Sequence, residues 1–264
     1  MTANIFQPLS FELTGRVVEY LAPLAPDILR LSLHEHNYSI LAGDIVIAPT
    51  VRPLAIAPGA TAGVTHFAEP EYVILSPDIE KMRNRVKPPG KVVERGFISL
   101  GGADPGYLTL EILAAVSRFS ADRITWNVVL GPSSGYEARR LKAEYPDFIR
   151  FHNGLELSRR EFLELLGMSD ITITNAGTTL YEALALGRPA VAVPQNDFEA
   201  DVACALGEAG TCLVSQGSSR LTRKELASII SDSDRRIQMA TKGKATLDRR
   251  GAHRVAKIIL DKLG

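Results

Sequence analysis

Residues 170–201 read DITITNAGTTLYEALALGRPAVAVPQNDFEAD, and this stretch decides the fold class. It begins with a short apolar run, Ile171–Thr174, which has the length of a buried strand. A glycine turn and an apolar segment with helical spacing follow, and Gly187 marks the end of that predicted helix. A second apolar run, Ala190–Pro194, completes a strand–helix–strand unit. In such a unit the two strands lie parallel in one sheet and are joined by a right-handed crossover.

The same alternation continues on both sides of this unit. Further apolar runs of strand length lie at Phe97–Leu100, Trp126–Leu130, Phe148–His152 and Cys212–Val214. Three helix starts show a Ser or Thr followed three residues later by Glu, the capping-box pattern: Ser158 with Glu161, Thr179 with Glu182, and Thr222 with Glu225. Gly210 predicts another helix end. Alternating strands and helices predict a parallel sheet covered on both faces, in a doubly wound α/β domain.

The first part of the chain follows a different pattern. Phe11–Leu21 predicts a helix, and Asp44–Ala48 and Tyr72–Leu75 predict strands. Prolines are dense between Pro49 and Pro58 and exclude a long regular element there.

The KPPG stretch at Lys87–Gly90 is typical of a linker between domains. We therefore expect a small α/β domain at 1–90 and a larger, doubly wound α/β domain at 91–264. About 90 residues suffice for a small domain of this kind.

Composition excludes several classes of protein. Thirty basic residues balance thirty acidic ones, so the formal net charge is zero, which argues against a nucleic-acid partner. Cys204 and Cys212 are too few for a zinc or disulfide framework, and we expect two buried thiols in a reducing compartment. No apolar run reaches about 18 residues, so no transmembrane helix or stable membrane anchor is expected. Because the first residues also lack a signal-peptide pattern, the sequence predicts a cytoplasmic protein.

Two glycine-containing turns follow predicted strands. Gly101–Pro105 (GGADP) follows one strand, and Asn175–Thr179 (NAGTT) follows another. Ligands of open α/β sheets bind at the carboxyl ends of the strands. Each turn leads into a predicted helix, whose N-terminal N–H groups attract anions. Glycine admits a phosphate close to the backbone, and the hydroxyls of Thr178 and Thr179 add donors, so the two turns together suit a diphosphate.

Each turn alone also has a simpler explanation. Two glycines after a strand are about as often only a tight turn, and Glu182 is explained as the capping-box partner of Thr179. Neither turn has the Gly-Lys-Ser/Thr of a Walker A loop or the GxGxxG of a dinucleotide-binding turn, so ATP and NAD are disfavoured.

The order of the motifs is more specific than any one of them. The chain runs GVTHFAEPEYVILSPDI, FISLGGADPGYLTLEIL, VVLGPSSG, FHNGLE, the stretch at 170–201, and DRRGAHRVAKIIL. This order resembles the UDP-sugar hydrolases of pseudaminic acid biosynthesis and, more distantly, the GlcNAc transferase that completes lipid II. Both belong to the GT-B superfamily. The resemblance covers the chain from about Gly63 onward and implies a GT-B-like α/β fold with a nucleotide-sugar-binding C-terminal domain.

The resemblance also implies roles for individual residues. The second glycine turn and its helix hold the diphosphate in this family, which implies phosphate contacts for Ala176, Gly177, Thr178 and Thr179. Glu182 would accept hydrogen bonds from both ribose hydroxyls. The remaining residues carried over as substrate-binding are Gly101, Gly102, Asp104, Gly131, Asn153, Leu155, Asn175, Asn196 and Asp197. Of these, Asn196 and Asp197 occupy the position where the family touches the sugar, and the turn that contains Asn153 and Leu155 would contact the base through its backbone.

The chain departs from the family near its start. The region before Gly63 is shorter than a full GT-B N-terminal domain and lacks the GxGHxxR turn that carries the family's presumed catalytic histidine. His66 is the best replacement, because it lies in the segment that resembles the family, and His34 and His36 come next. No further ligand cluster accompanies these two histidines, so we expect neither a metal ion nor a cofactor.

Two functions are consistent with this pattern. The first is an enzyme that binds a UDP-sugar and breaks the bond at the anomeric carbon, with water or a sugar hydroxyl as acceptor. The second is a nucleotide-sugar-binding module without catalysis, or one subunit of a split glycosyltransferase. Both a homo-oligomer and a separate partner subunit stay open.

Overall fold

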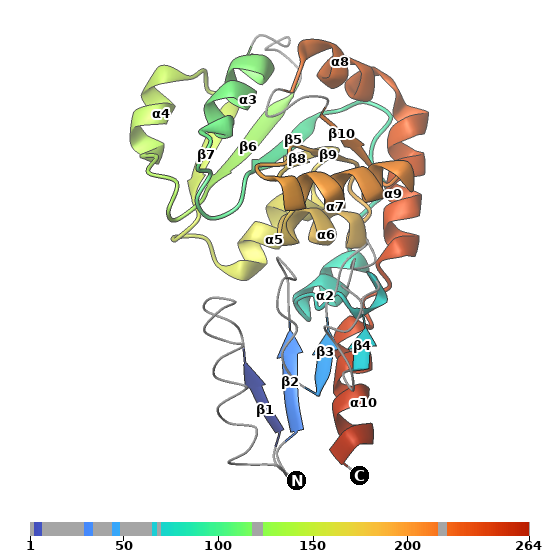
Figure 1. Cartoon of the computed structure of the whole chain (residues 1–264). Coiled ribbons are helices and arrows are strands. Elements are labelled where there is room, and N and C mark those ends of the chain that lie inside the picture. The colour runs from blue at the N-terminus through green and yellow to red at the C-terminus, as the bar shows by residue number, and fades with distance from the viewer. Residues whose placement is uncertain are drawn as a thin grey trace. The chain divides into compact units, whose positions relative to one another are not determined.

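The computed structural model describes residues 3–6, 29–33, 44–47, 65–67, 70–117, 124–215 and 221–263. The chain forms two compact units, each clear in Figure 1: Met1–Leu75 with Asp248–Gly264, and Ser76–Leu247. The division into domains at 1–90 and 91–264 stays a prediction. The predicted helix at Phe11–Leu21 lies outside the described residues.

The larger unit is built on a six-stranded parallel sheet. Its strands are β5 (Arg95–Ser99), β6 (Thr125–Leu130), β7 (Ile149–Asn153), β8 (Ile171–Thr174), β9 (Ala190–Ala192) and β10 (Cys212–Val214). Each predicted strand is present, within a few residues of its predicted ends. The spatial order β7-β6-β5-β8-β9-β10 is that of a doubly wound nucleotide-binding domain, and its two halves diverge between β5 and β8.

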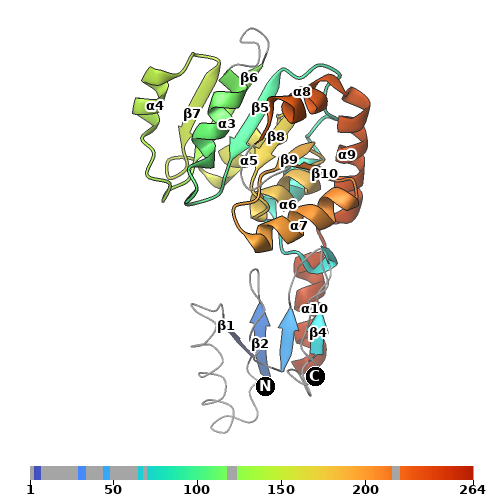
Figure 2. The same ribbon diagram turned by 45° about the horizontal axis from the view of Figure 1, so that its top comes forward.

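Helices cover both faces of this sheet, as Figures 1 and 2 show. The helices over the sheet are α3 (Leu108–Ser117), α4 (Ala138–Glu144), α5 (Arg159–Gly167), α6 (Thr178–Ala185), α7 (Asp197–Glu208), α8 (Arg223–Ser231) and α9 (Ser233–Thr246). A further short helix, α2 (Asp78–Arg83), packs against α5 and α6. Neighbouring residues of β5 face opposite layers. Ile98 belongs to the apolar core that contains Ile112 of α3, whereas Phe97 packs edge-on against Phe162 of α5, with 5.4 Å between ring centroids.

Most of the predicted helix ends are confirmed. Two capping boxes stand at the starts of α5 and α8: Ser158 with Glu161, and Thr222 with Glu225. Gly187 and Gly210 end α6 and α7 with φ values of +67° and +71°, which favour glycine.

The third predicted capping box, Thr179 with Glu182, is wrong. Helix α6 begins at Thr178 with Gly177 as its N-cap, so Thr179 lies inside the first turn. Glu182 is then too far along the helix to reach the cap, and its carboxylate has another partner, described below.

The stretch Lys87–Gly90, predicted as a linker, lies inside the larger unit. Arg236 donates to the carbonyl oxygens of Gly90 and Lys91 at 3.1 and 2.6 Å. The N–H of Gly90 donates to the carboxylate of Asp170 at 3.2 Å. The stretch is therefore part of the framework of this unit.

The smaller unit holds a four-stranded parallel sheet in the order β1-β2-β3-β4. Its strands are β1 (Ala3–Phe6), β2 (Leu29–Leu33), β3 (Ile45–Ile47) and β4 (Thr65–Phe67), and β3 confirms the strand predicted at Asp44–Ala48. Helix α10 (Gly251–Leu263) packs on this sheet, since Val255 lies in one apolar core with Leu31, Ile45 and Ile47. The last helix of the chain thus belongs to the same compact unit as the first strands.

The strand predicted at Tyr72–Leu75 is wrong. Pro70–Tyr72 forms a short 3-10 helix, η1, and the N–H of Val73 donates to the carbonyl oxygen of Pro70 at 3.1 Å. Proline is well suited to the first turn of a helix because its missing N–H has no partner there in any case. The apolar run that follows it is therefore used in a turn, where Val73 is buried and Ile74 is exposed.

Candidate functional site

The two glycine turns predicted from the sequence lie at the point where the sheet changes direction. Strands β5 and β8 are hydrogen-bonded neighbours, with Ser99 opposite Thr174. A Cβ on Gly101 would lie 3.4 Å from the side-chain nitrogen Nδ2 of Asn175, so the turns that follow the two strands are adjacent. In open α/β sheets this divergence point is where ligands bind.

The turn after β5 ends in a helix that is already capped. The two carboxylate oxygens of Asp104 accept hydrogen bonds from the N–H groups of Leu108 and Thr109, each at 3.0 Å. The hydroxyl of Tyr136 donates to the same carboxylate at 3.0 Å. Burial, reinforced by the charge of Asp104, raises the pKa of Tyr136. The first turn of α3 therefore offers fewer free N–H donors than the sequence suggested, and it carries a negative charge.

The turn after β8 is different, because no side chain among the described residues caps α6. Its N-cap is Gly177, which has an extended backbone and no side chain that could accept from the first N–H groups of the helix. The first N–H groups of a helix have no partner within the helix itself, and together with the dipole they attract anions. Since Thr178 and Thr179 also carry hydroxyls, this is the more suitable of the two turns for a phosphate.

The turns are held in place by a buried polar network. Asn175 donates to Glu199 at 2.7 Å, and Glu199 also accepts the backbone N–H of Gln195 at 2.8 Å. The side chain of Gln195 donates to the carbonyl oxygen of Leu100 at 2.7 Å, which ties the loop after β9 to the end of β5. Asn196 is the N-cap of α7 and accepts the N–H of Glu199 at 2.9 Å.

Glu182 lies one turn inside α6 and is almost completely buried. Its carboxylate forms an ion pair with Arg159, the first residue of α5. The guanidinium carbon of Arg159 also lies 5.2 Å from the centre of the Phe162 ring. Sequence reasoning missed Arg159. The one signal that it offers is a cation in the first turn of a helix, where the dipole disfavours positive charge.

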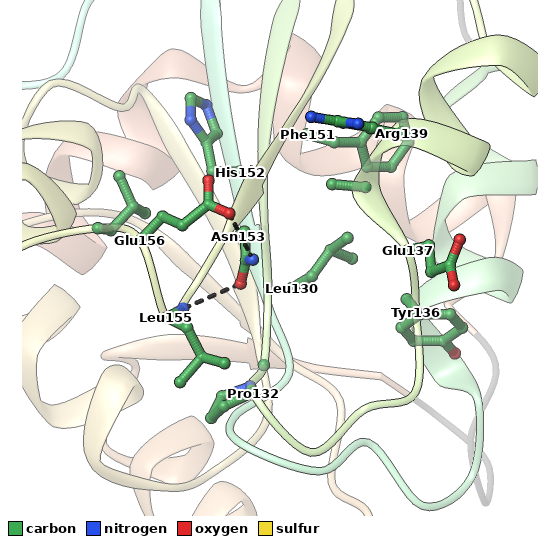
Figure 3. Close-up of a pocket in the computed structure, with 13 residues that line it drawn as sticks. Leu130, Pro132, Tyr136, Glu137, Arg139, Phe151, His152, Asn153, Leu155 and Glu156 are labelled. Carbon is green, nitrogen blue, oxygen red and sulfur yellow. Dashed lines mark hydrogen bonds between the residues drawn. The ribbon is translucent and has the colours of Figure 1, made fainter.

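A cavity of about 710 Å³ lies between the loops that follow β6 and β7. Figure 3 shows Tyr136 and Glu137 on one side of it and Asn153, Leu155 and Glu156 on the other. The side chain of Asn153 shapes this second wall, since it donates to Glu156 and accepts the N–H of Leu155, each at 3.0 Å.

The N–H groups of the turn after β7 are already used inside the protein. Gly154 donates to the carbonyl oxygen of Leu130 at 2.9 Å, and Glu156 and Leu157 donate to that of Asn153. Since the N–H of Leu155 is also bonded, backbone contacts from 154–157 to a base would use carbonyl oxygens, which accept hydrogen bonds.

Two further residues fix the shape of this region. A Cβ on Gly131 would lie 2.1 Å from the carbonyl oxygen of Gly101, so glycine is required where the loops after β6 and β5 meet. His152 contacts Asn127 through Nε2 at 3.0 Å. Burial, together with the nearby charge of Arg150, lowers the pKa of His152.

The structure does not describe the side chains of the candidate catalytic histidines. His34 and His36 lie outside the described residues, and for His66 only the backbone in β4 is described, opposite Val46 of β3. Within the described ranges, no three His, Cys, Asp or Glu side chains come together as metal ligands. No helix there is long and apolar enough to cross a membrane.

The expectation of two buried cysteines is half right. Cys212 is buried, which raises its pKa to about 12, but Cys204 of α7 is exposed. Its position on the outer face of that helix is not evident from the apolar residues around it in the sequence.

Comparison with known proteins identifies two relatives, and no family model matches the chain. An uncharacterized protein of Methanocaldococcus jannaschii is 33% identical over 141 residues, which are 51% of this chain and only 28% of that protein. The spore coat polysaccharide biosynthesis protein SpsG of Bacillus subtilis is 24% identical over 264 residues, covering 96% of this chain and 76% of SpsG.

Solved structures resemble the chain over nearly its whole length. MurG of Acinetobacter baumannii matches with a TM-score of 0.64 and 17% identity, over 97% of this chain and 72% of MurG. The spinosyn rhamnosyltransferase SpnG complexed with thymidine diphosphate matches with a TM-score of 0.63 and 15% identity, over 93% and 69%. MnaA of S. aureus in its UDP co-structure matches with a TM-score of 0.64 and 14% identity, over 99% and 76%.

These likenesses show that the chain has an α/β GT-B-like fold, as predicted from the order of its motifs. The closer assignment, to the hydrolases of pseudaminic acid biosynthesis, is not confirmed.

Proposed function

We propose that the chain binds the nucleoside diphosphate of a sugar nucleotide at the carboxyl ends of β5 and β8 and cleaves the bond at the anomeric carbon. The observation that carries the proposal is the N-terminus of α6, which has a glycine as its N-cap and begins at the divergence point of the sheet. Two structural neighbours, SpnG and MnaA, were solved with thymidine diphosphate and UDP, which supports a ligand of this class.

In this proposal the leaving diphosphate is stabilised by backbone donors. The N–H groups and hydroxyls of Thr178 and Thr179 contact phosphate oxygens, and Gly177 admits the ligand close to the backbone. Donors that are fixed before the reaction stabilise the charge that develops on the leaving group. The same role is proposed for Asn175 and Ala176 by position, since they form the start of this turn.

The ribose and base extend from there along the edge of the sheet. Glu182 accepts hydrogen bonds from the ribose hydroxyls, and the turn that contains Asn153 and Leu155 contacts the base. Carbonyl oxygens in that turn suit a base with an N–H donor, such as uracil or thymine. Every common base offers such a donor, so the choice of UDP or thymidine diphosphate rests on the neighbours solved with these nucleotides.

The remaining residues carried over from the resemblance lie around the same edge. Gly101 and Gly102 are proposed to keep side chains away from the ligand, and Gly131 lets the loop after β6 pack against them. The exposed residues Asn196 and Asp197 are proposed to contact the sugar. The carboxylate of Asp104 is used to cap α3, so we assign it a structural part in shaping the turn.

The alternative, a binding module without catalysis, predicts the same nucleotide contacts, and no structural feature favours it. UDP release from UDP-sugars, followed with water alone and with added hydroxyl acceptors, separates a hydrolase and a transferase from a module that only binds.

UDP is expected to stabilise the protein against heat. At 100 times its dissociation constant, a ligand that binds only the folded state adds about 2.7 kcal/mol. For a chain of this size that corresponds to an increase in Tm of roughly 5–10 °C. The measurement is a thermal unfolding scan with UDP, with uridine and orthophosphate as controls. An unchanged Tm with every nucleoside diphosphate at millimolar concentration would contradict the proposed function.

A further inference from the structure

We propose that Arg159 changes partner when a nucleotide binds: its guanidinium leaves Glu182 for the diphosphate, and the carboxylate becomes free for the ribose. This inference rests on the proposed function. It adds a binding residue that neither the motif order nor the resemblance identifies.

The first support is the geometry of the ion pair. Arg159 begins α5 and Glu182 lies in α6, two helices that start at the same edge of the sheet. The side chain of Arg159 is 43% exposed, whereas that of Glu182 is 3% exposed. The cation therefore lies on the solvent side of the carboxylate and holds one of its oxygens, which a ribose hydroxyl would have to take over.

The second support is the short distance from this ion pair to the phosphate-binding turn. Glu182 follows Thr178 by four residues, which places the two on one face of α6, separated by one turn of about 5.4 Å. Side chains on a helix lean toward its N-terminus, so Glu182 points in the direction of that first turn. In the proposed exchange, a rotation of the long Arg159 side chain carries its guanidinium from the carboxylate toward a phosphate at Thr178.

The third support is that the surroundings of Arg159 disfavour its positive charge, although an aromatic ring supports the side chain. Burial lowers its pKa, and the dipole of α5 disfavours a cation in its first turn. Phe162, which leans against Phe97, gives the guanidinium a flat support that does not depend on Glu182. A diphosphate offers it more negative charge than one carboxylate, in a geometry that a guanidinium binds through two hydrogen bonds at once.

The exchange is tested by measuring the dissociation constants of UDP, UMP and uridine by calorimetry for the wild-type protein and for Arg159→Met. The variant is expected to weaken UDP binding about 10- to 100-fold, as for loss of a charge-assisted hydrogen bond. Uridine is expected to bind Arg159→Met at least as tightly as wild type, because Glu182 is then uncovered. Arg160→Met is the matched control, since Arg160 lies next in α5 and pairs with Glu164 at 2.8 Å on the exposed face.

Other outcomes have distinct meanings. If the wild-type protein binds none of the three ligands, the proposed function fails. If it binds UDP but Arg159→Met weakens UDP and uridine equally, or neither, then Arg159 only supports the fold and the exchange is wrong. Arg159→Lys serves if the methionine variant does not fold: it keeps the charge without the two-pronged geometry, and an intermediate loss of UDP affinity is expected.

Discussion

Replacing Glu182 by glutamine is expected to weaken the binding of UDP and of uridine 10- to 100-fold. The change removes the charge that strengthens hydrogen bonds to the ribose hydroxyls, each contributing roughly 1.5–3 kcal/mol. It also removes the ion pair with Arg159. Since Arg159 stays half exposed, the free energy of unfolding is expected to fall by about 1 kcal/mol or less.

The measurement is calorimetric titration of the Glu182→Gln protein, together with its denaturant unfolding curve. Glu164→Gln is a suitable control, because Glu164 pairs with Arg160 on the exposed side of α5. If Glu182 served only the ion pair, stability would fall while both affinities stayed at wild-type values. The loss of uridine affinity also distinguishes this variant from Arg159→Met, which is expected to bind UDP more weakly but uridine at least as tightly as wild type.

An aspartate in place of Gly177 is expected to abolish UDP binding while leaving the helix intact. Aspartate is a favoured N-cap, and the backbone of Gly177 is extended, with φ of −94°, so the residue fits the cap conformation. Its carboxylate would occupy the N–H groups of α6 and repel a diphosphate. At an effective dielectric constant of about 20, two charges about 4 Å apart interact by about 4 kcal/mol, so a loss of at least about 100-fold is expected.

Gly177→Asn separates charge from occupancy. Asparagine caps a helix about as well as aspartate but carries no charge, so a loss of about 10-fold is expected. In both variants a new Cβ lies 3.1 Å from the side-chain nitrogen Nδ2 of Asn175, which must shift by a few tenths of an ångström. Equal UDP affinity in wild type and Gly177→Asp would show that the phosphate does not bind at this helix.

The sheet could be predicted because its strands are short, apolar and bounded by clear turn residues. The predictions for Ile171–Thr174 and Cys212–Val214 match the observed ends, because each is a short apolar run flanked by polar residues. In the sequence, the apolar run at Tyr72–Leu75 has the same pattern as these strands. Only the hydrogen bond from Val73 to Pro70 reveals it as a turn, and no local pattern predicts that bond.

The site was harder to predict because its polar residues form hydrogen bonds with partners other than those that the local pattern predicts. Thr179 and Glu182 match a capping box, yet the N-cap is Gly177, two residues before Thr179, and the carboxylate pairs with Arg159 instead. Asp104 lies in a glycine turn typical of a phosphate site, but the turn brings it onto the N–H groups of α3. These partners are 23 residues apart in the case of Arg159 and Glu182, so spacing in the sequence does not indicate them.

Backbone amide shifts during a titration with UDP test the central claim most directly. In heteronuclear NMR spectra of the whole chain, the N–H signals of Gly177, Thr178 and Thr179 are expected to move most, because they are the proposed donors to the diphosphate. The signals of Leu108 and Thr109, whose N–H groups Asp104 already holds, are expected to move little. Saturable shifts that are largest at α3, or no shifts at millimolar UDP, would contradict a diphosphate site at the start of α6.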